Sequence, residues 1–194
     1  ELELQGAPLQ VVGQGFLGGT VAAVFASRYQ ENVKQLVLMN APLDEEFSGS
    51  IPQPLAPLLN PLFGQIFCQN PLKMVGQPIE SSGPYSLDVN DQVAYQQPLL
   101  SDGNAGFAAM EICKQMKKSG GQATRAALEA LSEDEAPETV VAWGLNDVWL
   151  GERAPSAVPK NAKIIGVSGV GHFAPEDWAE KAADVILGVQ ADES

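Results

Sequence analysis

The sequence predicts a single α/β domain with a mostly parallel sheet and an inserted helical cap. The chain has 194 residues, 45% of them hydrophobic, which is enough for one well-filled core and too little for two ordinary domains. Near both ends, short apolar segments that stop at glycine or asparagine alternate with segments of helical periodicity. The middle of the chain instead combines proline-rich stretches with further helical patterns.

The N-terminal part predicts a strand, a tight turn, a helix and a second strand. The first strand comprises residues 9–12 and runs into Gly13, the helix comprises residues 17–29, and the second strand comprises residues 35–40. A unit of this length implies a right-handed crossover between parallel strands. The acidic residues 1–6 have no apolar run or basic start, so they predict the glycine-closed tail of a helix rather than a secretory signal.

The C-terminal part repeats this alternation. Residues 139–144 and 162–167 predict two more strands, and residues 178–187 predict a closing amphipathic helix. Four parallel strands in two pairs are the minimum sheet that the sequence predicts. Residues 1–41 and 136–194 would then form the core of the domain.

Residues 42–135 predict the helical cap, inserted between the two pairs of strands. Helical patterns occupy residues 89–97, 105–118 and 122–131. We expect the large apolar side chains of this segment to pack against one another as the core of the cap, although they could instead roof an apolar pocket. These residues are Leu55, Leu58, Leu59, Leu62, Phe63 and Phe67. The acidic residues 132–138 predict a solvated connector without a functional role.

Charge and composition exclude several classes of function. The 11 Lys and Arg against 24 Asp and Glu give a net charge of −13, which argues against binding to nucleic acid or to an anionic membrane surface. No apolar segment reaches the roughly 20 residues that a transmembrane helix needs. Cys68 and Cys113 predict two buried thiols, because two cysteines make no disulfide framework and have no metal-ligand spacing. With His172 as the only histidine, no metal and no cofactor are predicted.

Three short motifs follow predicted strands, in a fixed order. Residues 13–18 read Gly-Gln-Gly-Phe-Leu-Gly, residues 143–147 read Trp-Gly-Leu-Asn-Asp, and residues 169–173 read Gly-Val-Gly-His-Phe. In this order the chain from residue 9 to its end resembles the α/β-hydrolase superfamily, most closely its haloalkane-dehalogenase-like and plant or algal plastid branches. In that superfamily a sharp strand-to-helix turn presents the nucleophile, and the acid and the histidine follow later in the chain.

The resemblance implies a role for each matching residue. Asp147 matches the carboxylate that orients the imidazole, His172 matches the general base, and the backbone N–H of Phe16 matches one donor of the oxyanion hole. The nucleophile position falls on Gly15, which has no side chain and so supplies no nucleophile. Other side chains that could attack a substrate lie in the predicted helix or cap, where a structural role is favoured: Thr20, Ser27, Cys68 and Cys113.

The resemblance also implies that the first strand, Leu9, Gln10, Val11 and Val12, is paired on both sides. An uncovered apolar edge is prone to aggregation, so we expect a protein partner, or an N-terminal segment outside this sequence, to cover it. The sequence thus favours a non-catalytic α/β-hydrolase-like structural subunit or binding module. A plastid membrane-associated complex is expected from the family resemblance alone, with the chain soluble or peripheral.

Two alternatives remain open at this point. The first is an active hydrolase or lyase of small apolar substrates that uses His172 and Asp147 without a protein nucleophile, with water or a substrate group in its place. The second is a carrier that holds an apolar small molecule beneath the cap without turnover. The sequence names neither a substrate nor a partner.

Overall fold

The computed structural model describes residues 6–43, 51–151 and 155–188. It contains a four-stranded sheet in the order β1-β2-β3-β4, and every neighbouring pair of strands is parallel. The α/β class with a mostly parallel sheet is therefore confirmed. The strands are β1 (Leu9–Gln14), β2 (Val33–Met39), β3 (Glu138–Gly144) and β4 (Lys163–Val167).

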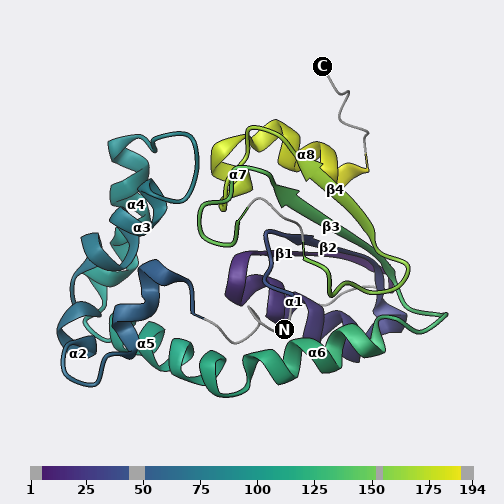
Figure 1. Cartoon of the computed structure of the whole chain (residues 1–194), viewed down its shortest axis with the longest axis horizontal. Helices are drawn as coiled ribbons and strands as arrows, with labels where there is room; N and C mark the ends of the chain where they lie inside the picture. Colours follow the sequence, from purple (N-terminus) through teal and green to yellow (C-terminus); the bar gives the residue numbers. More distant parts are fainter. Residues whose placement is uncertain (1–5, 44–50, 152–154, 189–194) are drawn as a thin grey trace.

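Helices cover both faces of the sheet (Figure 1). On one face lie α1 (Gly15–Arg28) and α6 (Gly121–Ala130), and on the other lies α8 (Ala179–Leu187), which follows the short α7 (Ala174–Asp177). Strand β2 is buried on both faces because successive side chains point to opposite sides. Leu36 and Leu38 pack toward α1 and α6, whereas Val37 and Met39 pack toward α8.

The first crossover is tightly packed because small residues line it. A Cβ atom at Gly13 would lie 2.5 Å from the Cβ of Ala22, and a Cβ at Gly19 would lie 2.3 Å from that of Ala41. Helix α1 can approach β1 and the end of β2 only because neither glycine carries a side chain. The helix begins at Gly15, directly after β1, two residues before the predicted start at Leu17.

The cap lies to one side of the sheet (Figure 1). Its core is rich in sulfur and includes Cys68, Met74, Met110 and Cys113. The predicted helix at residues 89–97 is present and longer. The cap elements are η2 (Gln53–Leu59), α2 (Gly64–Phe67), η3 (Leu72–Gly76), α3 (Gln77–Glu80), α4 (Val89–Ser101) and α5 (Ala105–Gln115).

The cap and the sheet are joined by one long helical segment. Helix α5 continues through a π-helical turn, η4 (Met116–Gly120), directly into α6, where the sequence predicts two separate helices. Gly120 and Gly121 do not interrupt the segment, because packing outweighs the modest cost of glycine within a helix. Ala127 and Leu128 of α6 pack in the same cluster as α1, so the end of the insertion contributes to the core of the sheet.

The expectation that the apolar cap residues pack together holds for only some of them. Leu58 is fully buried, with Leu55, Leu59 and Phe67 packed around the same cluster. Leu62 and Phe63 are instead 77% and 62% exposed, because the turn before α2 directs them away from the cap core. The predicted helical tail at residues 1–6 falls almost entirely outside the described residues.

Candidate active site

The residues of the candidate site follow the carboxyl ends of all four strands. Gly15 comes directly after β1 and Asn40 directly after β2, while Asp147 and His172 stand in the loops after β3 and β4. In a parallel sheet these ends lie at one edge, where α/β proteins bind their ligands. The fold therefore brings together residues that are up to 157 positions apart, from Gly15 to His172.

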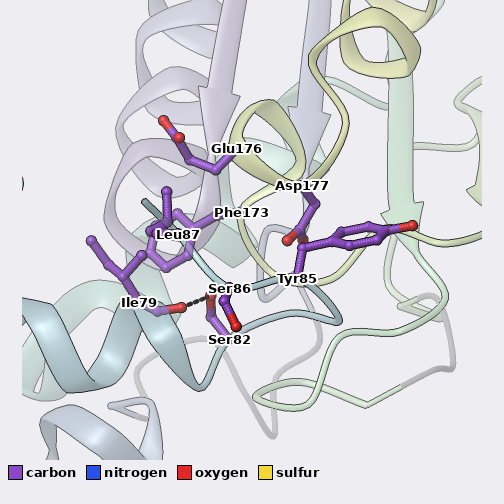
Figure 2. Close-up of a pocket in the computed structure, with 8 residues that line it drawn as sticks. All are labelled: Ile79, Ser82, Tyr85, Ser86, Leu87, Phe173, Glu176 and Asp177. Atoms are coloured by element: carbon purple, nitrogen blue, oxygen red, sulfur yellow. Dashed lines mark hydrogen bonds between the residues drawn. The ribbon is translucent and has the colours of Figure 1, made fainter. Parts of the chain in front are cut away.

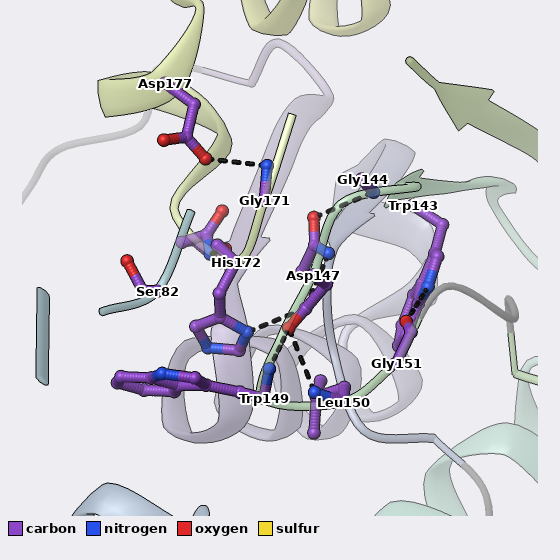
Figure 3. Close-up of polar contacts among 12 residues, drawn as sticks. Ser82, Trp143, Gly144, Asp147, Trp149, Leu150, Gly151, Gly171, His172 and Asp177 are labelled. Carbon is purple, nitrogen blue, oxygen red and sulfur yellow. Dashed lines mark hydrogen bonds and ion pairs between the residues drawn. The ribbon is translucent and has the colours of Figure 1, made fainter. Parts of the chain in front are cut away.

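His172 and Asp147 form a buried pair. Nδ1 of His172 lies 2.9 Å from Oδ2 of Asp147, and each residue is only 2% exposed. The second carboxylate oxygen, Oδ1, accepts hydrogen bonds from the backbone N–H groups of Trp149 and Leu150, at 2.8 and 2.9 Å (Figure 3). These contacts fix the carboxylate, and the carboxylate orients the imidazole.

Asn40 is a member of this site that the sequence analysis did not single out. Its side-chain amide donates from Nδ2 to Oδ2 of Asp147 at 2.8 Å, and its Oδ1 accepts from the backbone N–H of Gly144 at 3.2 Å. Its φ of 46° is positive, which is uncommon outside glycine and tolerated best by asparagine and aspartate. An asparagine closing an apolar strand was the sequence signal for this position.

Aromatic rings enclose the imidazole of His172. Trp149 stacks on it with a centroid separation of 4.5 Å and an interplanar angle of 27° (Figure 3). Phe173 meets it edge-on with a centroid separation of 5.1 Å. The indole N–H of Trp149 is buried and has no hydrogen-bond partner within the described part of the chain. The Trp149 ring therefore shields the His172–Asp147 pair from water, and its indole N–H can still donate a hydrogen bond to a ligand.

Gly15 faces the other nitrogen of the imidazole. It has a φ of +66°, and a Cβ atom built on it would lie 3.2 Å from Nε2 of His172. No group of the described residues hydrogen-bonds this nitrogen. A side chain at position 15 would thus point at Nε2, which is the relationship between a nucleophile and its general base.

Phe16 and Gln14 flank this glycine. The backbone N–H of Phe16 lies in the first turn of α1, where amides have no partner within the helix, and its side chain packs into the cap core. Gln14 donates from Nε2 to the carbonyl of His172 at 2.5 Å and so ties β1 to the histidine loop. These positions are compatible with the predicted oxyanion donor at Phe16.

The other candidate nucleophiles have structural contacts. Thr20 is buried and its hydroxyl lies 3.2 Å from the carbonyl of Phe16 and 3.1 Å from the hydroxyl of Thr124, while Ser27 donates to the carbonyl of Val24. Cys68 and Cys113 are free buried thiols in the cap, as predicted. Burial raises the pKa of both thiols, that of Cys113 to about 11, so neither forms a thiolate readily.

A small hollow of about 20 Å³ lies where the cap meets α7, next to the His172 loop (Figure 2). This volume suits about one water molecule. Asp177 lines it and accepts a hydrogen bond from the N–H of Gly171 at 2.7 Å, and desolvation raises the pKa of this carboxyl. The other lining residues are Ile79, Ser82, Tyr85, Ser86, Leu87, Phe173 and Glu176.

The cap touches this loop directly. The backbone N–H of His172 donates to the carbonyl of Ser82 at 2.9 Å, and Tyr95 of α4 donates its hydroxyl to Glu176 of α7. Neither a three-residue cluster suited to a metal ion nor a helix long and apolar enough to cross a membrane occurs within residues 6–43, 51–151 and 155–188.

Solved structures with this architecture include haloalkane dehalogenases and a lipase. The haloalkane dehalogenase DbeA from Bradyrhizobium elkanii, as a loop variant, matches 95% of this chain and 68% of its own, with 17% identity and a TM-score of 0.70. The haloalkane dehalogenase DatA from Agrobacterium tumefaciens C58 matches 94% and 67%, with 18% identity and a TM-score of 0.70. A lipase from Acinetobacter baumannii AYE matches 94% and 58%, with 17% identity and a TM-score of 0.58.

No family model matches the sequence, and no curated protein sequence matches it either. At identities of 17–18% the structural likeness bears on the fold and not on the activity. Together with the parallel sheet and its helices, it shows that the chain has an α/β-hydrolase-like fold.

Proposed function

We propose that this protein is a non-catalytic member of the α/β-hydrolase-like group that acts as a structural subunit or binding module. The observation that carries the proposal is Gly15. It stands at the strand-to-helix turn with its Cα–Cβ direction toward Nε2 of His172, where a hydrolase of this fold needs a nucleophilic side chain. Because glycine has none, this position supplies no atom to form a covalent intermediate.

The edge of the sheet supports the structural-subunit part of the proposal. Strand β1 pairs only with β2 within the described residues, and its Val12 is 43% exposed although such parallel strands are normally covered on both sides. Val21 of the following helix is also exposed, at 58%. A partner chain or a further segment of the same protein would cover these side chains.

Native mass spectrometry of the protein isolated under mild conditions tests the subunit role. We expect the chain to be held inside a larger complex with at least one other polypeptide. A free chain of substantially greater mass would contradict the subunit role, because an additional segment of the same protein would then cover β1. The plastid location stays a prediction from the sequence resemblance.

The absence of catalysis is tested with purified protein and with ester, epoxide and haloalkane substrates. We expect no turnover above that of His172→Ala, because the missing nucleophile blocks the first step in both proteins. An exposed-site variant, Asp134→Asn, controls for mutagenesis in general. Turnover by the unmodified protein that is lost in His172→Ala and kept in Asp134→Asn would overturn the proposal.

The buried His172–Asp147 pair favours a second candidate, an active hydrolase or lyase. In the hydrolytic case, Nε2 would take a proton from a water whose oxygen attacks the substrate, Asp147 would stabilise the imidazolium, and the proton would pass to the leaving group. This candidate predicts turnover that falls in both His172→Ala and Asp147→Asn. Equal loss in both variants with an unchanged Asp134→Asn would favour it over the non-catalytic role.

A further inference from the structure

Three groups around Gly15 and the imidazole of His172 can hydrogen-bond a ligand. Nε2 of His172 has no hydrogen-bond partner among the described residues although His172 is only 2% exposed, and it is aimed at the space that a side chain on Gly15 would fill. The Phe16 N–H in the first turn of α1 has no acceptor within the helix. The buried indole N–H of Trp149, on the ring stacked against the imidazole, also has no acceptor within the part of the chain that the structure describes.

The polarity of these groups selects the chemistry of a ligand. Nδ1 of His172 faces the Asp147 carboxylate, so in the neutral imidazole it holds the proton and Nε2 is an acceptor. Nε2 then requires a donor, whereas the Phe16 N–H requires an acceptor. A hydroxyl group satisfies both at once, because its oxygen accepts while its proton is donated.

The surroundings favour a neutral, flat and apolar molecule. Trp149 and Phe173 supply aromatic surface next to the imidazole. The nearby carboxylates of Asp147 and Asp177, together with a net charge of −13, disfavour an anion. An uncharged phenol or alcohol on an apolar skeleton meets both conditions.

We infer that this protein binds the hydroxyl group of a small apolar alcohol or phenol over Gly15, in the place that a nucleophilic side chain would occupy, with Nε2 of His172 as the acceptor. Such a ligand would specify the proposed role as a binding module, and its site rests on the proposal that Gly15 stands at the nucleophile position. The ligand hydroxyl takes over the hydrogen bond that a serine hydroxyl would otherwise donate to the histidine. Binding alone is required, without turnover.

The single histidine gives a direct test by NMR. In ¹⁵N-labelled protein, a long-range ¹H–¹⁵N spectrum contains one imidazole, so Nε2 and Nδ1 of His172 are assigned without ambiguity. We expect phenol to shift the Nε2 resonance saturably and more than that of Nδ1. Toluene has a similar shape without the hydroxyl and should leave Nε2 unshifted. The inference would be overturned if phenol caused no saturable shift of the Nε2 resonance in the unmodified protein, or if toluene caused an equal shift.

Variants at matched glycines extend the test. Gly15→Ala places a methyl group against Nε2 and should weaken phenol binding by about tenfold or more, the loss expected for one hydrogen bond and its steric replacement. Gly188→Ala carries the same backbone strain, with a φ of +70°, in open space at the end of α8, and should bind phenol normally. Unchanged affinity in a folded Gly15→Ala would contradict the inference. Ester turnover by the unmodified protein would instead contradict the non-catalytic role and leave the phenol result standing.

Discussion

A Cβ atom on Gly15 would lie 3.2 Å from Nε2 of His172, although the two residues come from opposite ends of the chain. The same imidazole is held from its other nitrogen by Asp147, at 2.9 Å. The buried pair of imidazole and carboxylate therefore lies beside a position that lacks a side chain.

Asp147→Asn should destabilise the fold strongly. The carboxylate lies within hydrogen-bond distance of His172 Nδ1, the Asn40 amide and two backbone N–H groups, and an asparagine amide would turn one of its two acceptor oxygens into a donor. Leaving buried donors without acceptors should lower the free energy of unfolding by about 2–4 kcal/mol. Urea unfolding measures this change.

The matched control for that variant is Asp134→Asn, in the exposed acidic connector before β3. A surface change of this kind should alter the free energy of unfolding by less than about 0.5 kcal/mol. Equal effects of the two substitutions would mean that the hydrogen bonds of Asp147 contribute nothing to stability.

Asp177 should make stability fall as the pH rises. Burial raises the pKa of its carboxyl above the ordinary value of an aspartate, so the folded protein binds this proton more tightly than the unfolded chain does. The resulting stabilisation is complete below the unfolded pKa and is lost as the pH rises through the folded pKa. Asp177→Asn removes this ionisation, so its stability relative to the unmodified protein should increase from pH 3 toward neutral pH.

The free energy of unfolding of Asp177→Asn and of the unmodified protein, measured by urea unfolding from pH 3 to neutral pH, provides this comparison. Asparagine keeps an oxygen that can accept from the N–H of Gly171, so the variant preserves this backbone contact. A stability difference that is constant with pH, or that shrinks as the pH rises, would show that Asp177 is not the source of the effect.

The two thiols of the cap should be unreactive in the folded protein. Cys68 and Cys113 are buried, and their raised pKa values leave little thiolate at pH 8. Ellman's reagent should modify neither thiol rapidly in native buffer and both in guanidinium chloride. Rapid modification of either cysteine under native conditions would mean that the cap core opens far more readily than its packing implies.

The sheet was predictable from the sequence because its local signals and its packing agree. The apolar segments before Gly13, before Asn40 and at Trp143 all form strands, and their parallel arrangement followed from the helical segments that join them. The cap was less predictable. The sequence predicts separate helices at residues 105–118 and 122–131, yet the helical segment from α5 to α6 continues through Gly120 and Gly121 between them.

The His172–Asp147 pair was predicted from the order of motifs at strand ends, and the two side chains lie within hydrogen-bond distance. Asn40 could not be assigned in the same way, because its contact with Asp147 depends on a positive φ and on the register between β2 and β3. The stacking of Trp149 on His172 likewise depends on the path of the loop after β3. Neither relationship has a signal in local sequence periodicity.

Restoring a nucleophile tests the central claim most directly. In Gly15→Ser the hydroxyl would be presented to Nε2 of His172, with a cost of about 1–2 kcal/mol for the left-handed backbone and a small adjustment of the imidazole. A fluorophosphonate reacts with such a serine when the oxygen attacks phosphorus, fluoride leaves, and the histidine takes the serine proton. Intact-mass spectrometry then detects the added phosphonyl group, and peptide mapping locates it.

We predict one adduct on Ser at position 15 of the Gly15→Ser variant. No adduct should form on the unmodified protein, on the matched-strain control Gly188→Ser, or on a Gly15→Ser variant that also carries His172→Ala. A folded Gly15→Ser protein that is labelled no faster than Gly188→Ser would contradict the claim that Gly15 stands at the nucleophile position of this site.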